Sequence, residues 1–117
     1  MFSRKFSIRD RADFLRAKNL GKCVKLRDVI VQYFIYNDSS EGCRFGYTAT
    51  KKLGDAVCRN RVKRRLKNAV YSVFKDDQIL DSSVDIVFIA RSTTINCDWQ
   101  RLIKQISLAM FEIKAMF

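Results

Sequence analysis

Residues 59–67 read Arg59-Asn60-Arg61-Val62-Lys63-Arg64-Arg65-Leu66-Lys67, and this stretch decides both how the chain packs and what it binds. Val62 and Leu66 are four residues apart, which predicts a helix with one buried side. The apolar row continues through Ala69, Val70 and Val73. Helical spacing places six other residues on the opposite arc, namely Arg61, Arg64, Arg65, Lys67, Asn68 and Tyr71. One helix therefore packs into a core and presents a dense row of cations.

The charge of this region is unbalanced. No carboxylate lies between Asp55 and Asp76, although exposed helix faces normally mix charges of both signs. Eight cations and one carboxylate give residues 51–67 a net charge of +7, out of +11 for the whole chain. Arginine dominates, and its planar guanidinium suits bidentate contact with phosphate. The ordinary alternative is a solvated charged face, but a polyanionic partner explains the imbalance better.

The length fits one domain over residues 1–117. The chain is 48% apolar, which argues against disorder, and its pI near 9.9 favours nucleic acid or an anionic membrane surface as a partner. The apolar runs are too short to span a membrane, for which roughly 20 residues are needed. The N-terminus has no apolar stretch of the signal-peptide kind. We therefore expect a cytoplasmic protein that does not bind membranes.

No residue pattern predicts a protein-borne active site. The chain has no histidine, which removes the commonest general base and the usual Ser/His and Cys/His nucleophile systems. Its four cysteines are widely separated and form no C-x2-C pair, so a structural zinc site is not expected. The adjacent carboxylates Asp76 and Asp77 fit a solubilising turn better than a catalytic pair. We expect no catalytic and no metal-binding residues.

The pattern of elements predicts an α+β fold in the order α-β-β-α-β-α, with helices packed on a single-layer, mostly antiparallel sheet. We expect a first helix over about 8–20, capped by Ser7 or Asp10, and a long strand over 26–36. A loop at 37–42 and a strand over 44–50 would complete an antiparallel hairpin. The basic helix is expected over about 60–74, with Arg59 or Asn60 near its N-cap. A buried strand over 84–90 and a helix capped by Asp98 follow.

Residues 44–64 carry a specific resemblance. They read Arg-Phe-Gly-Tyr-Thr-Ala-Thr-Lys-Lys-Leu-Gly-Asp-Ala-Val-Cys-Arg-Asn-Arg-Val-Lys-Arg, which resembles the R-x-G…K-K-x-G-x-A-V-x-R-N-R-x-K-R signature of the bacterial ribonuclease P protein subunit. The order of elements extends the similarity over nearly the whole chain. The resemblance implies that family's left-handed β-α-β crossover, whereas general rules favour a right-handed one between parallel strands.

The resemblance also implies a function. The protein would be the protein component of a ribonucleoprotein endoribonuclease that removes the 5′ leader from precursor tRNA. The RNA subunit would carry out the catalysis and hold most of the required Mg²⁺. The implied partners are that catalytic RNA and precursor tRNA, with no obligate protein partner. A ribosomal or RNA-chaperone protein is the alternative, because similar folds host many functions.

Two sets of site residues follow from the resemblance. Contacts with the catalytic RNA are expected from Arg59, Asn60, Arg61, Lys63, Arg64, Arg65 and Lys67, with Lys51 and Lys52 close by. A separate cleft between the first helix and the sheet would bind the leader through Phe14, Lys18, Ile30, Gln32 and Phe34. Core packing is the alternative for Phe14 and Phe34, and helix capping for Asn60. Lys18 stands at a position that is often aromatic or apolar in the family, and Gln32 at one that is often aromatic, so this cleft would be more polar.

Overall fold

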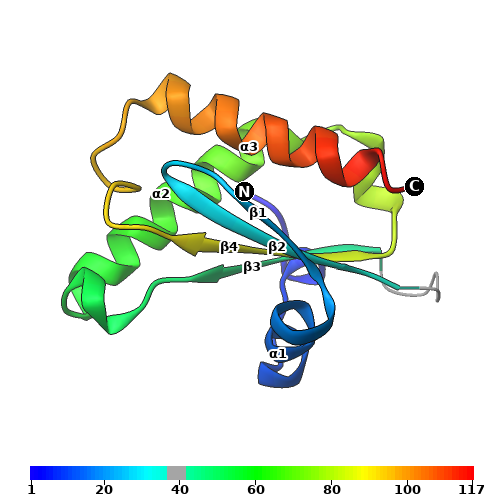
Figure 1. Cartoon of the computed structure of the whole chain (residues 1–117), viewed down its shortest axis with the longest axis horizontal. Coiled ribbons are helices and arrows are strands. Elements are labelled where there is room, and N and C mark those ends of the chain that lie inside the picture. The colour runs from blue at the N-terminus through cyan, green and yellow to red at the C-terminus, as the bar shows by residue number, and fades with distance from the viewer. Residues whose placement is uncertain (37–41) are drawn as a thin grey trace.

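In a computed structural model of the chain, residues 1–36 and 42–117 are described, and among them four strands form one sheet in the order β1-β2-β4-β3 (Figure 1). The strands are β1 (Lys22–Lys25), β2 (Val29–Ile35), β3 (Cys43–Thr48) and β4 (Val84–Ala90). The helices are α1 (Arg11–Leu20), α2 (Ala56–Phe74) and α3 (Trp99–Lys114). Short 3-10 turns lie at Arg4–Phe6, Lys51–Leu53 and Gln78–Asp81. Residues 37–41 of the expected loop lie outside the described residues.

The expected hairpin between the strands near 26–36 and 44–50 is wrong. β2 pairs antiparallel with β1 and with β4, whereas β3 pairs parallel with β4 at the edge of the sheet. β4 takes the place between them because six of its seven residues are buried, which is characteristic of an interior strand. The expected long strand begins at Val29 instead of Leu26, because residues 26–28 form the turn that precedes it. β1 lies before that turn, in a stretch where no strand was expected. The hairpin therefore joins β1 to β2.

The fold class is confirmed as α+β, with a sheet in which two of the three strand pairings are antiparallel. The observed order, α-β-β-β-α-β-α, differs from the expected one by the added strand β1. The parallel strands β3 and β4 are connected through α2, so a β-α-β crossover is present. The hand of that crossover stays a prediction.

The helices lie on both sides of the sheet, with α2 and α3 over one face and α1 over the other (Figure 1). The larger core joins α2 and α3 to Val29, Val31 and Phe88 of the sheet. A smaller cluster on the α1 face contains Ile8, Ala17 and Val87. The sheet therefore has apolar side chains on both of its faces. None of the helices in the described ranges is long and apolar enough to cross a bilayer.

The basic helix is seated by the predicted apolar row. Val62, Leu66, Ala69 and Val70 are at most 3% exposed, whereas Val73 is half-buried. Each large apolar side chain buried in this way contributes about 2 kcal/mol to folding. α2 is thus held against the sheet and α3, and its outer side is free to carry charge.

The expected start of this helix near Asn60 is wrong. α2 begins at Ala56, and its N-cap is Asp55, whose carboxylate accepts a 3.0 Å hydrogen bond from the backbone nitrogen of Cys58. Asp55 is the better cap because a carboxylate also interacts favourably with the positive end of the helix dipole. Gly54 precedes it with φ of 122°, a conformation that favours glycine. Asn60 therefore lies in the second turn of α2 and does not cap it.

The N-terminal segment covers part of the sheet edge that β3 forms. The backbone nitrogen of Ile8 donates a 2.9 Å hydrogen bond to the carbonyl of Phe45, and Ser7 forms an isolated parallel bridge with the same residue. β3, the edge strand, therefore has a partner on its outer side along part of its length.

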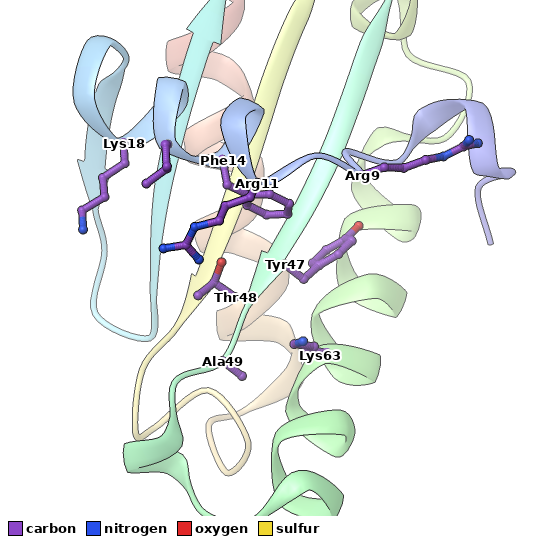
Figure 2. Close-up of a pocket in the computed structure, with 9 residues that line it drawn as sticks. Arg9, Arg11, Phe14, Lys18, Tyr47, Thr48, Ala49 and Lys63 are labelled. Carbon is purple, nitrogen blue, oxygen red and sulfur yellow. The ribbon is translucent and has the colours of Figure 1, made fainter.

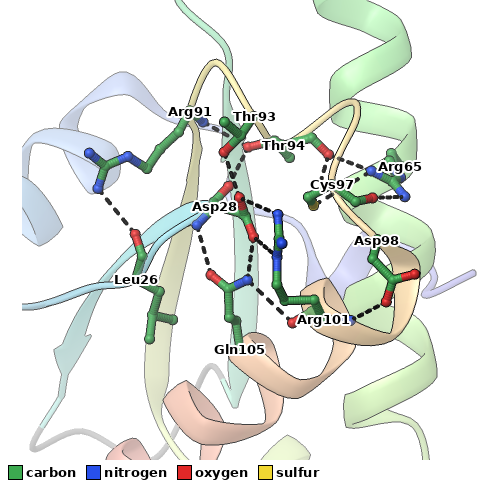
Figure 3. Close-up of polar contacts among 10 residues, drawn as sticks. All are labelled: Leu26, Asp28, Arg65, Arg91, Thr93, Thr94, Cys97, Asp98, Arg101 and Gln105. Atoms are coloured by element: carbon green, nitrogen blue, oxygen red, sulfur yellow. Dashed lines mark hydrogen bonds and ion pairs between the residues drawn. The ribbon is translucent and has the colours of Figure 1, made fainter.

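A buried carboxylate fixes the turn between β1 and β2 (Figure 3). Asp28 is fully buried and accepts hydrogen bonds of 2.6–2.8 Å from Thr93 Oγ1, Arg101 Nε and Gln105 Nε2. Burial alone would raise the pKa of Asp28, but these hydrogen bonds and the charge of Arg101 outweigh it and hold that pKa well below its ordinary value. The network joins the β1–β2 turn to the segment after β4 and to α3.

We predict that Asp28→Asn lowers the free energy of unfolding at pH 7 by about 2 kcal/mol, because it weakens charge-assisted hydrogen bonds. The pKa of Asp28 is depressed in the folded state, so its contribution is complete above the unfolded-state pKa of about 3.9 and is lost as pH falls below it. Urea denaturation at pH 7 and pH 3 should therefore show a smaller difference between wild type and variant at pH 3. The exposed Asp10→Asn is the control, and an equal difference at both pH values would contradict the assignment.

Candidate nucleic-acid interface

The outer side of α2 presents exposed cations that have no acidic partner. Arg61, Arg64 and Lys67, here called the α2 ridge, are exposed together with Asn60. No ion pair in the described part of the chain joins a cation of residues 51–67 to a carboxylate. The nearest acid in sequence, Asp55, caps the helix. The ridge is therefore available for an external anion.

Lys51 and Lys52 extend this charged surface. Both are exposed in the 3-10 turn that runs directly into the N-terminus of α2. Arg59 lies at the same end of α2 but is half-buried, and its Nε donates to the Asp55 carbonyl at 3.4 Å. Of the expected RNA contacts near this end, the two lysines are the more accessible.

Lys63 lies on the flank of α2 that faces the sheet edge, and it is half-buried. Lys67 leans toward the same edge, with its Nζ 5.8 Å from the ring centroid of Tyr47 on β3. These two lysines therefore connect the outer surface of α2 with the region between α2 and α1.

Arg65 lies on the opposite flank, where its guanidinium is engaged within the protein (Figure 3). Its Nη1 donates to the carbonyl of Thr94 and its Nη2 to that of Cys97, both at 2.7 Å. The guanidinium carbon also lies 5.6 Å from the ring centroid of Trp99. Arg65 thus ties α2 to the segment that precedes α3, an arrangement that its local sequence does not reveal.

A cavity of about 510 Å³ lies between α1, β3 and α2. Figure 2 shows Arg11, Phe14 and Lys18 on α1, with Tyr47 and Thr48 on β3. The full lining is Arg9, Arg11, Phe14, Leu15, Lys18, Tyr47, Thr48, Ala49 and Lys63. We call this the α1–β3 cavity. Its lining contains four cations and no carboxylate, with two aromatic rings among them.

Two of the five residues expected to bind the leader line this cavity, namely Phe14 and Lys18. Ile30 and Gln32 are half-buried in β2 and line none of the cavities described here. Phe34 lines a different cavity of about 180 Å³. Its ring lies against the guanidinium of Arg16, whose central carbon is 5.0 Å from the ring centroid. Phe34 and Phe14 therefore line different cavities, although both pack against the small cluster of Ile8, Ala17 and Val87.

The leader cleft and the basic helix were expected to be separate surfaces, but the α1–β3 cavity adjoins the basic helix. Lys63 lines the α1–β3 cavity, and a second cavity of about 240 Å³ is lined by Phe14, Tyr47, Lys63 and Lys67 among others. The missed lining residues are Arg9, Arg11, Leu15, Tyr47, Thr48 and Ala49. Tyr47 and Thr48 lie within the quoted 44–64 pattern, which could have pointed to them.

Tyr47 gives the cavity a neutral aromatic wall. Its ring stacks on Phe88 with the centroids 5.8 Å apart, and burial raises the pKa of its phenol above the ordinary value. The hydroxyl therefore stays protonated at neutral pH. Cations beside aromatic surfaces are the combination that single-stranded nucleic acid needs, because they match phosphates and bases respectively.

The side chains of the described residues do not fit a resident metal ion. Within residues 1–36 and 42–117, no group of three or more Asp, Glu or Cys side chains is close enough together to hold one. The carboxylates of Asp28 and Asp85 are buried and already paired with arginines. No step of the proposed function is therefore assigned to a metal held by this chain.

Comparisons with known proteins agree with the geometry. The family model described as Ribonuclease P matches residues 2–114. The ribonuclease P protein component of Gluconacetobacter diazotrophicus is 37% identical over 94 residues, which cover 80% of this chain and 78% of that protein. The corresponding protein of Caulobacter vibrioides strain NA1000 is 38% identical over 108 residues, covering 92% and 70%.

A solved structure is similar as well. It is a Staphylococcus aureus RNase P protein, a mutant with defective mRNA degradation activity, and it superposes with a TM-score of 0.75 at 27% identity. The superposition covers 93% of this chain and 88% of that one. The family match spans nearly the whole sequence and includes the basic helix and both sides of the α1–β3 cavity. This chain therefore belongs to the ribonuclease P protein family.

Proposed function

We propose that this protein grips the catalytic RNA subunit with the α2 ridge and guides the 5′ leader of precursor tRNA through the α1–β3 cavity. Family membership makes the chain a protein component of ribonuclease P, a ribonucleoprotein endoribonuclease of tRNA processing in which the protein alone is not catalytic. The observation that carries the proposal is the unpaired ridge, which adjoins a cavity lined by cations and aromatic rings.

The ridge suits contact with a folded RNA backbone. Arg61, Arg64 and Lys67 are exposed on one helix, so successive turns can meet successive phosphates. Each phosphate that a cation neutralises releases condensed counterions, which favours binding at low salt. Lys51 and Lys52 continue the positive surface past the N-terminus of α2. Such contacts set position and affinity without reading sequence.

The α1–β3 cavity suits an unpaired strand. Phe14 and Tyr47 offer aromatic surface to bases, and Arg11, Lys18 and Lys63 offer charge to phosphates. Lys63 also adjoins the ridge, so a leader in the cavity would run beside the RNA subunit. Holding the leader there orients the scissile bond relative to the catalytic RNA.

The chemistry is assigned to the RNA. We propose that Mg²⁺ is held mainly by the RNA subunit and that the protein lowers repulsion between the two RNAs. The cytoplasm is the proposed location. The ribosomal or RNA-chaperone alternative is not favoured, because the family match and the named relatives all point to ribonuclease P.

Reconstitution tests the proposal directly. The catalytic RNA is assayed for cleavage of a precursor tRNA at near-physiological magnesium, with and without this protein. We expect the protein to raise the cleavage rate strongly and to show no cleavage when the RNA subunit is omitted. An unchanged rate would reject the assignment, and cleavage by the protein alone would indicate a protein nuclease.

The double variant Arg61→Ala/Arg64→Ala should weaken binding to the catalytic RNA. Two phosphate contacts would be lost, so the slope of log affinity against log salt should fall by about two. Filter binding over a range of salt concentrations measures it. Arg65→Ala is the matched control because its guanidinium bonds backbone carbonyls; it should lower the melting temperature and leave the slope unchanged. Equal slope changes in both variants would contradict this division.

The double variant Arg11→Gln/Lys18→Gln should weaken binding of precursor tRNA by about tenfold at low salt, because two phosphate contacts of the leader are removed. Both side chains are exposed, so folding should be little affected. The affinity of the reconstituted enzyme is measured for tRNA with and without its leader. Lys104→Gln, an exposed change on α3, is the control. A loss that is equal for both tRNAs would argue against leader contact.

A further inference from the structure

We propose that Arg44 and Gly46 of β3, together with Asp85 of β4, form a docking site for the Asp13-Phe14 pair of α1. This site would set the position of α1 over the sheet, which makes Arg44, Gly46 and Asp13 positioning residues for the α1–β3 cavity. The inference rests on the proposed leader function of that cavity. It gives a physical reason for the Arg-x-Gly spacing in residues 44–46.

The first half of the site is ionic. Arg44 forms a two-pronged contact with Asp85, with Nε donating to Oδ1 and Nη2 to Oδ2, both at 2.9 Å. The same Nη2 lies 3.5 Å from Oδ2 of Asp13 on α1. The fork of one arginine therefore faces a carboxylate of the sheet and a carboxylate of the helix.

A second arginine closes the group from the α1 side. Arg16 Nη2 lies 3.0 Å from Asp13 Oδ1 and 3.5 Å from Asp85 Oδ2. Its guanidinium carbon is 4.8 Å from the ring centroid of Tyr36. Two arginines and two aspartates thus form one neutral group that connects α1 with β3 and β4.

Burial makes this group selective for one placement of the helix. The side chain of Asp85 is fully buried, and those of Arg44 and Asp13 are 16% and 17% exposed. Charges removed from water to this extent need their partners. A shift of α1 would break the two contacts that cross from helix to sheet, Arg44 with Asp13 and Arg16 with Asp85, although Arg44 would keep Asp85 and Asp13 would keep Arg16. The pairing therefore specifies where Asp13 must lie.

The second half of the site is steric. A Cβ atom placed on Gly46 would lie 2.5 Å from Cε1 and 2.8 Å from Cζ of Phe14. Real Cβ contacts do not come so close, so the Phe14 ring lies directly on the backbone of β3. Glycine is needed at residue 46 because of this close approach and not because of its backbone angles.

Strand alternation explains the spacing. Residues 44 and 46 point to the α1 face, whereas Phe45 between them packs into the larger core on the other face. Arg44 is opposite Asp85 in the register and Gly46 is opposite Val87, which belongs to the smaller cluster beneath α1. Two consecutive residues of α1 therefore contact alternate residues of β3. Asp13 pairs with Arg44, and the ring of Phe14 packs on Gly46.

The docking site affects the shape of the α1–β3 cavity because α1 contributes residues to both. Arg11, Phe14 and Lys18 line the cavity and lie within five residues of Asp13. Displacement of α1 would move all three relative to Tyr47 and Lys63. Arg61 and Arg64 of the α2 ridge line neither this cavity nor the second one, so their geometry should not depend on the position of α1.

The test compares two affinities of the reconstituted enzyme, one for precursor tRNA and one for the same tRNA lacking its leader. Gly46→Ala and Asp13→Asn should each reduce the leader-dependent ratio by about tenfold, equivalent to about 1.4 kcal/mol. Affinity for the catalytic RNA should be unchanged. Asp13→Glu, which keeps the charge, should recover part of the ratio.

A double variant separates positioning from loss of fold. Phe14→Leu removes the ring atoms that overlap residue 46, so Gly46→Ala/Phe14→Leu should bind no worse than Phe14→Leu alone. Val31→Ala, on the other face of the sheet, controls for general destabilisation and should leave the ratio unchanged. If Gly46→Ala does not fold, Asp13→Asn carries the test.

Two outcomes would overturn the inference. A clear leader-dependent ratio in the wild type that Asp13→Asn and Gly46→Ala both retain would reject the docking site and leave the proposed function standing. A wild type with no leader dependence would reject the leader assignment itself, and with it this inference.

Discussion

The contact between the apolar underside of α2 and the sheet is the constraint on which the rest of the molecule depends. Leu66, Val70 and Phe74 are fully buried there. A helix with so many like charges would be a poor helix in isolation, because neighbouring cations repel and no carboxylates relieve them. Tertiary burial overrides that local cost, and the cations remain unpaired on the outside. Burial of the apolar side of α2 thus compensates for the repulsion among the cations on its outer side.

Features that depend on local periodicity could be predicted from sequence. The apolar row of α2, the strand at 84–90 and the capping of α3 by Asp98 are all confirmed. The path of β3 and the break before β2 could not be predicted. That break depends on Asp28, whose partners Thr93, Arg101 and Gln105 are 65 to 77 residues away in sequence. No local pattern carries that information.

The candidate site divides in the same way. The charge pattern located the basic residues, but helical spacing placed Arg61, Arg64 and Arg65 together on the outward arc without distinguishing Arg65. Arg64 and Arg65 are neighbours of the same type, yet the first is exposed and the second bonds carbonyls of the segment before α3. The cavity draws its lining from the N-terminal segment, α1, β3 and α2, so only the fold could assemble it. Three residues of β2 that were expected in the leader cleft, Ile30, Gln32 and Phe34, do not line this cavity.

The two margins of the sheet carry a further consequence, for self-association. An unpaired strand margin invites another copy to add to the sheet. At β3 the segment around Ser7 and Ile8 occupies part of that position, and at β1 the exposed Lys22 and Lys25 would place like charges together if two copies met there. Extension of the sheet by a second copy is therefore disfavoured at both of its edges.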